Sequence, residues 1–399
     1  MTIEQALPVQ AHPAEDPPPL PKPKLPGLHE VIAQVESDLF KSKDVQDTAT
    51  FSYQWTADQF GHFALGFEIT FALSWVAALL GYAGGRVGFW IGLAVVLIFV
   101  LKEANDFRIE WRKACDAKSV FKFNSLEIFS NTFTAVFYIA LGGIVAAFGL
   151  LAPGYGLISI PVTAVFALGL GYVWLRKKIT FQQAGLPYLY RLANFPSPIP
   201  KASAQFIVNL SKPSAPDTPP TIADHLIIAG PLDSGKSSLA VGIGTEFAFR
   251  MGIARYTTLS KLLQAALKDG QWDKPEFDDG RILWPWQTSD LLIVDDVDVI
   301  SDHVPGTSMA VETERQIVQS RVNTLKSQIP PVLQDALKYR RTVWVVGDIN
   351  DGELLRWQKL IADMIETSLD RVQTVLLKQK VYELDPNRPS PSKEEQIQQ

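Results

Sequence analysis

Four long apolar runs constrain the fold of this chain more strongly than any other feature. They cover residues 63–82, 87–101, 129–151 and 155–175 of the 399-residue sequence. The hydrocarbon core of a bilayer is about 30 Å thick and needs roughly 20 helical residues to cross it. Three runs reach that length, and the second reaches it when residues 85–102 are included. A buried soluble core explains one such run but hardly four, so we predict a four-helix α-helical transmembrane domain over residues 61–178.

Basic residues indicate how these helices are oriented. The two short loops that separate the runs within each hairpin contain Arg86 as their single basic residue. The loop at residues 102–127 and the end of the fourth run are basic, with Lys102, Arg108, Arg112, Lys113, Lys118, Lys122, Arg176, Lys177 and Lys178. Lys and Arg close to membrane helices stay on the cytosolic side. We therefore expect a multi-pass protein of the cell inner (cytoplasmic) membrane, in contact with the lipid bilayer, with loop 102–127 and both termini in the cytosol.

Proline-dense segments flank the predicted membrane domain. Residues 1–60 form a cytosolic N-terminal segment whose proline-rich start we expect to be disordered, as a solvated tail rather than a docking motif. Residues 179–220 again hold many prolines, which predicts a semi-rigid juxtamembrane linker. Aromatic residues between 186 and 195 could lie on the bilayer surface. Residues 221–380 then read as a soluble domain, followed by a polar tail at 381–399.

The soluble domain opens with a phosphate-binding pattern. The apolar stretch 225–229 is typical of a buried strand, and an apolar helical stretch begins at Leu239. Between them lies a G-x-x-x-x-G-K-[ST] motif in its required strand–loop–helix context. The predicted nucleotide-binding residues are Gly230, Pro231, Leu232, Asp233, Ser234, Gly235, Lys236, Ser237 and Ser238.

Each position of this motif has a chemical reason. The glycines let backbone N–H groups surround the phosphates at a helix N-terminus. Lys236 is expected to reach the β- and γ-phosphates of ATP, and the Ser237 hydroxyl is expected to bind Mg²⁺. Lys236 is for that reason also a catalytic candidate.

A second motif follows about 60 residues later. Four apolar residues, 291–294, predict a central parallel strand that ends in Asp295 and Asp296. The carboxyl ends of parallel strands deliver side chains to the same edge of the sheet as the P-loop. We expect Asp295 to hold Mg²⁺ through water and Asp296 to polarise the attacking water. The two motifs together are specific, whereas either alone is common.

Three further residues are weaker candidates. A third apolar strand, 342–346, is followed by Asp348 and Asn350. Either side chain could sense the γ-phosphate, or it could simply cap the next helix. Arg371 precedes a last predicted strand, 372–377, and an arginine there can neutralise transition-state charge in a neighbouring subunit's site. The alternative for Arg371 is a surface salt bridge with Asp370 or another neighbour.

These motifs together resemble the AAA+ ATPases, and within them the bacterial helicase-loader and transposition-helper branch. The likeness rests on residues 230–238, on a short strand feeding a helix at 252–263, on 291–296, and on the arginine before the last strand. It covers about 155 residues and none of the membrane part. The resemblance implies an α/β P-loop NTPase domain with a five-stranded parallel sheet, and homo-oligomers that share active sites. One departure is that few residues follow Leu377, so no full helical lid or second sensor arginine is visible.

Composition and missing motifs narrow the function. Residues 221–399 carry 20 Lys/Arg and 26 Asp/Glu, so the soluble domain is acidic. Direct nucleic-acid binding is not favoured, because it needs a broad basic surface. A GTPase is disfavoured since no N-K-x-D segment appears, and an ABC-type ATPase since no L-S-G-G-Q-like segment follows the P-loop.

The leading hypothesis is a membrane-anchored ATPase that uses ATP binding and hydrolysis to remodel or assemble a protein partner or its own membrane helices. The first alternative is an ATP-gated oligomeric switch or signalling scaffold with slow turnover. The second is an energiser of a membrane channel or transporter, which the scarcity of polar residues along the helices makes weaker.

Overall fold

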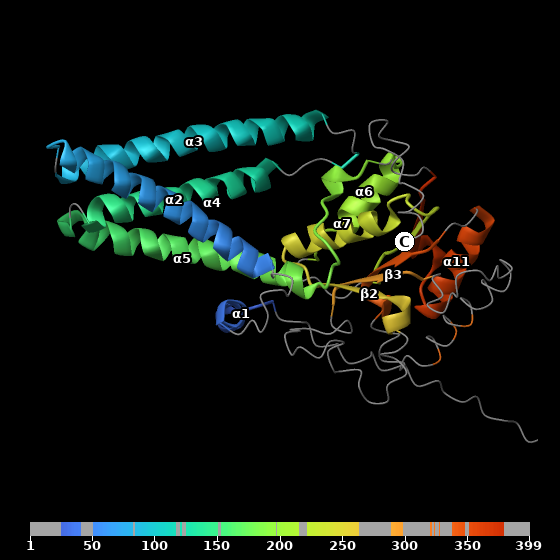
Figure 1. The fold of residues 1–399 in the computed structure, drawn as a ribbon. Helices are drawn as coiled ribbons and strands as arrows, with labels where there is room; N and C mark the ends of the chain where they lie inside the picture. The colour runs from blue at the N-terminus through green and yellow to red at the C-terminus, as the bar shows by residue number, and fades with distance from the viewer. Residues whose placement is uncertain are drawn as a thin grey trace, which may run out of the picture.

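The computed structural model describes two parts of the chain, a bundle of long helices and an α/β domain (Figure 1). The residues described are 25–40, 51–82, 84–116, 120–121, 125–150, 153–196, 198–214, 222–262, 289–297, 320, 323, 327, 337–347 and 351–378. The polar tail 381–399 and the proline-rich start of the N-terminal segment lie outside them.

The helical part contains α1 (Leu28–Phe40), α2 (Phe51–Leu79), α3 (Gly85–Asp116), α4 (Ser125–Ile144), the π-helical turn η1 (Val145–Leu150) and α5 (Pro153–Gln183). Within the described residues, three helical segments are long and apolar enough to cross a membrane: Phe51–Leu79, Arg86–Arg112 and Ile128–Gly149. The fourth predicted run lies in α5, where several side chains near the start fall outside the description. The count of four therefore stays a prediction.

Helices α2 and α4 approach each other very closely. A Cβ atom added to Gly66 would collide with the backbone carbonyl of Ile139, and one added to Gly142 would collide with that of Phe63. Small residues permit such contacts between membrane helices. Helix α5 joins the same bundle, because the Trp174 indole donates a hydrogen bond of 2.9 Å to the Thr134 hydroxyl.

The α/β domain is built on a single parallel sheet of five strands, as expected. The strands are β1 (His225–Ala229), β2 (Ala254–Thr258), β3 (Leu291–Asp295), β4 (Arg341–Val345) and β5 (Val372–Leu376). Their spatial order is β2-β3-β4-β1-β5, and each neighbouring pair is parallel. Strands β1 and β3 are buried along their whole length, which explains their continuous apolar sequence: helices cover both faces of such a sheet.

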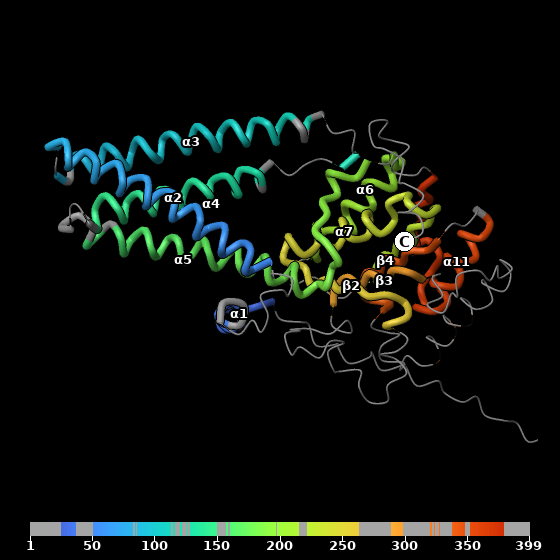
Figure 2. Tube along the Cα trace, in the orientation of Figure 1, coloured from blue at the N-terminus to red at the C-terminus, as the bar shows by residue number. Residues whose placement is uncertain are grey.

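Helices lie on opposite faces of the sheet (Figure 2), and an apolar cluster packs against each face. On one face α6 (Lys201–Leu210) and α7 (Lys236–Phe249) pack against residues such as Leu226 and Ile228. On the other, α11 (Asp351–Met364) contributes Ile361 against Ile227 and Trp344.

The segment predicted as a juxtamembrane linker packs into this core. Its first residues complete α5, and the short 3-10 helix η2 (Leu192–Asn194) and α6 follow. Leu186, Leu192, Phe195 and Ile207 are all buried in the cluster that contains α7 and one face of the sheet. The prolines separate short stretches that each supply an apolar side chain. Residues 186–195 therefore cover α7, whereas the sequence suggested that their aromatic side chains could lie on the bilayer surface. Residues 215–221 lie outside the description.

Candidate nucleotide-binding site

The backbone of the P-loop requires glycine at both ends. Gly230 follows β1 with φ 155°, and a Cβ there would lie 2.5 Å from the Leu377 carbonyl oxygen and 2.9 Å from the Ser234 hydroxyl oxygen. Gly235 caps α7 in the left-handed region with φ 84°. Asp233 also has a positive φ, 62°. These values describe a tightly wound loop whose shape excludes side chains at the two glycines.

The loop presents polar groups suited to a phosphate. Lys236 starts α7, and its ammonium donates to the carbonyl oxygens of Gly230 at 2.7 Å and Pro231 at 2.9 Å. The Ser234 hydroxyl is buried and has no hydrogen-bond partner among the described residues. The first N–H groups of a helix lack intrahelical acceptors and attract anions. The residues present therefore fit a bound phosphate chain.

The acidic pair lies at the end of β3, on the same edge of the sheet as the P-loop. Asp295 is buried, and one carboxylate oxygen accepts the backbone N–H of Asp296 at 2.8 Å. The other accepts the Tyr256 hydroxyl at 2.7 Å. Asp296 is exposed and has a positive φ of 52°. The Asp295 carboxylate is thus fixed by two donors, while Asp296 is exposed.

Tyr256 is a site residue that the sequence analysis missed. Burial, and the negative charge of Asp295 beside it, raise the pKa of Tyr256 well above its ordinary value. The phenol therefore stays protonated and remains a donor to the carboxylate. Tyr256 lies on β2, which pairs in parallel with β3. The register places Tyr256 beside Ile293, two residues before Asp295. A tyrosine on the strand next to the acidic one was the available sequence signal.

Tyr188 is a second residue that the sequence analysis did not single out. Its hydroxyl lies 3.0 Å from that of Ser238 in the first turn of α7. No local pattern links these two residues, which are separated by 50 positions. The segment that follows α5 thus reaches the phosphate-binding motif directly.

Arg371 lies away from the P-loop of its own chain. It is in the short 3-10 helix η4 (Leu369–Arg371) before β5, and donates to the Asp224 carboxylate at 3.0 Å. Asp224 precedes β1, so the pair occupies the edge of the sheet opposite to the phosphate-binding loop, roughly 20 Å away at about 3.3 Å per strand residue. This is the surface salt bridge that the sequence left open, although its partner is Asp224 rather than Asp370.

The remaining candidates can be placed only in part. Asp348 and Asn350 lie outside the described residues, so their sensor role stays a prediction. Ser237 follows Lys236 on α7 and is partly buried. The described residues contain no group of three or more His, Cys, Asp or Glu that could hold a metal ion by itself. Protein-bound Mg²⁺ commonly has one or two protein ligands beside substrate phosphates, and Ser237 with Asp295 fits that pattern.

Comparisons with known proteins yield distant likenesses. No protein-family model matches the chain, and no curated protein sequence matches it. The crystal structure of the DnaC helicase loader is 12% identical, covering 50% of this chain and 98% of its own, with a TM-score of 0.27. AMPPCP-bound DnaA from Aquifex aeolicus is 16% identical, covering 52% of this chain and 58% of its own, with a TM-score of 0.28. TM-scores this low carry no argument about function. The assignment of a nucleotide-binding site therefore depends on the chain's own residues.

Proposed function

We propose that this chain is a membrane-anchored AAA+-like ATPase. It binds ATP and Mg²⁺ on the cytosolic side of the inner membrane, acts as a homo-oligomer, and transmits hydrolysis to its own membrane helices or to a protein partner. The P-loop geometry at Gly230 and Gly235 and the acidic pair on the same edge of the sheet support the ATPase assignment.

One observation carries the coupling part of the proposal. The chain leaves α5 and pairs at once with β2, because the Tyr256 N–H donates to the Ala184 carbonyl at 2.8 Å and Arg255 donates to that of Gln183 at 2.9 Å. The same Tyr256 holds Asp295 through its hydroxyl. A shift of the Asp295 side chain would therefore be transmitted through Tyr256 to the end of α5.

The chain's own residues divide the work as follows. Lys236 and the first turn of α7 bind and orient the phosphates, while Ser237 and Asp295 would hold Mg²⁺. Bound Mg²⁺ would neutralise negative charge on the terminal phosphates. Asp296, exposed beside Asp295, would orient the attacking water, and Arg371 is assigned to the site of the next subunit.

Measurements on the detergent-purified full-length chain test this proposal. Lys236→Ala should abolish both ATP binding and phosphate release. Asp296→Asn should leave ATP binding intact while turnover falls by about a hundredfold or more, as for the loss of a group that acts mainly in the transition state. Tight ATP binding by the wild type without turnover would instead support the slow oligomeric switch.

A further inference from the structure

A pocket of about 430 Å³ lies between α6, the segment around η2, and α7. Its polar lining includes Arg191, Lys201, Arg250 and Glu246, and Phe121 contributes to its apolar wall. Phe121 belongs to the loop between α3 and α4, and its ring lies 6.4 Å from that of Phe195. The pocket thus forms where the loop of the helical bundle meets the α/β domain, on the face of the sheet covered by α7.

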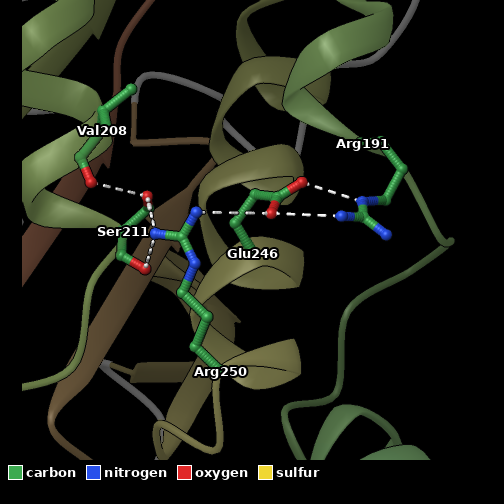
Figure 3. Close-up of polar contacts among 5 residues, drawn as sticks. All are labelled: Arg191, Val208, Ser211, Glu246 and Arg250. Atoms are coloured by element: carbon green, nitrogen blue, oxygen red, sulfur yellow. Dashed lines mark hydrogen bonds and ion pairs between the residues drawn. The ribbon is translucent and has the colours of Figure 1, made fainter. Parts of the chain in front are cut away.

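The pocket carries an excess of positive charge. Glu246 accepts two hydrogen bonds from Arg191, of 2.8 and 3.2 Å (Figure 3). Arg250 lies 3.9 Å from the same carboxylate and also faces the carbonyl and hydroxyl oxygens of Ser211. The lining therefore holds three cations and one carboxylate. Glu246 is buried and shared by two arginines, so it offsets one of the three positive charges and leaves a formal excess of two.

Basic groups continue from this pocket to the end of the bundle. Lys177, Lys178 and Arg191 surround the ring of Phe249, with their charged groups 4.9, 5.2 and 5.0 Å from its centre. The two lysines follow Arg176 just after the last apolar run on α5. Arg191 thus belongs both to the pocket and to a basic cluster at the predicted membrane boundary.

We propose that this pocket binds the phosphate of an anionic lipid headgroup from the cytosolic leaflet. Basic pockets on the cytosolic side of membrane helices attract such headgroups, and each basic residue near the surface contributes about a fivefold gain in affinity. The inference depends on the proposed membrane placement, but not on ATP hydrolysis.

The test uses the full-length chain in neutral detergent. Native mass spectrometry counts retained lipids while phosphatidylglycerol is titrated against phosphatidylcholine with the same acyl chains. The wild type should retain phosphatidylglycerol preferentially. Lys201→Gln, at the exposed start of α6, should weaken that retention about fivefold. Lys212→Gln, just beyond the other end of the helix and not among the lining residues, should leave it unchanged.

A third variant predicts an effect of the opposite sign. Glu246→Gln keeps acceptor capacity but removes the negative charge, so it should strengthen phosphatidylglycerol retention. A thermal melt of each variant checks that it is folded. Equal retention by wild type and Lys201→Gln overturns the proposal, as does equal retention of the two lipids.

Two further arms separate the alternative causes. Displacement of the lipid by millimolar inorganic phosphate, together with no preference between the two lipids, would assign the pocket to a free phosphate and overturn the lipid assignment. Release of the chain from membranes by alkaline carbonate would refute the membrane placement itself, whatever the pocket binds.

Discussion

Tyr256 joins a helix of the bundle to the acidic end of β3 through two separate groups. Tyr256→Phe preserves the backbone N–H bond to Ala184 but removes the hydroxyl donor to Asp295. Loss of the partner that orients a metal-binding group typically lowers metal affinity 10- to 100-fold. We therefore expect the Mg²⁺ concentration for half-maximal ATP turnover to rise by about tenfold.

Tyr190→Phe is the matched control for this change. Its hydroxyl donates to the Asn194 carbonyl rather than to Asp295, and phenylalanine keeps the ring that lies beside Tyr188. A Mg²⁺ titration of Tyr256→Phe that superimposes on those of Tyr190→Phe and wild type would remove Tyr256 from the metal-positioning role.

His225 predicts how stability depends on pH. Burial lowers the pKa of this imidazole to about 4, and its Nδ1 pairs with the Thr342 hydroxyl at 2.8 Å. An unfolded histidine has a pKa of about 6.5, so the unfolded chain binds more protons between those values. The stability is therefore full above pH 6.5 and falls by up to about 3 kcal/mol as the pH drops toward 4.

Thermal melts of the detergent-purified chain at pH 7.5, 6.0 and 5.0 measure this effect. His225→Gln keeps a polar side chain but cannot take up the proton, so its melting temperature should fall less steeply with pH. Parallel pH profiles for the two proteins would show that other groups cause the acid sensitivity.

At the scale of elements, the closest packing in the bundle lies between α2 and α4. Gly142→Ala places a methyl group against the backbone of Phe63, which cannot move as a side chain end can. We expect a loss of about 1–3 kcal/mol, as for overpacking in a core, seen as a lower melting temperature.

Gly169→Ala on α5 is the matched control, because an added Cβ there meets no atom within 4 Å. It should be neutral or slightly stabilising, since alanine favours helix more than glycine does. Similar melting temperatures for the two variants would mean that α2 and α4 do not cross as closely as the structure places them.

Local patterns predicted the elements that depend on local chemistry. The strand–loop–helix at Gly230 and the strand ending at Asp295 follow from residues within one window, and both are confirmed as structural elements. The packing of residues 186–207 was not predicted, because its apolar positions find partners on α7, which begins 29 positions after Ile207. Similarly, the close approach of α2 and α4 involves Gly66 and Gly142, which lie 76 positions apart, so no local spacing marks it.

At the scale of the whole molecule, the two edges of the sheet divide the candidate site. The P-loop and Asp295 lie at one edge, while Arg371 lies with Asp224 at the other. Within one chain the arginine is therefore distant from the P-loop, and a catalytic role would require a neighbouring copy. The α/β domain and a bundle helix are connected through Ala184 and Tyr256, so assembly of the α/β domains would also bring bundles together.

This division makes a mixing experiment decisive. Lys236→Ala lacks the phosphate-binding lysine but keeps Arg371, whereas Arg371→Ala keeps an intact P-loop. Lys236→Ala alone should not turn over ATP. Arg371→Ala alone should turn it over about 10³-fold more slowly than the wild type. Mixed subunits contain some interfaces with both groups intact, so the mixture should regain a clear fraction of wild-type activity.

Asp224→Asn separates the catalytic role proposed for Arg371 from its ion pair with Asp224. It breaks the salt bridge to Arg371 but leaves the guanidinium in place, and exposed pairs of this kind contribute about 0–1 kcal/mol to stability. We expect wild-type turnover from Asp224→Asn and loss of turnover from Arg371→Ala, with unchanged ATP binding in both. If the two variants behave alike, and mixing restores nothing, Arg371 is a structural partner of Asp224 and the shared site must be completed by a different residue.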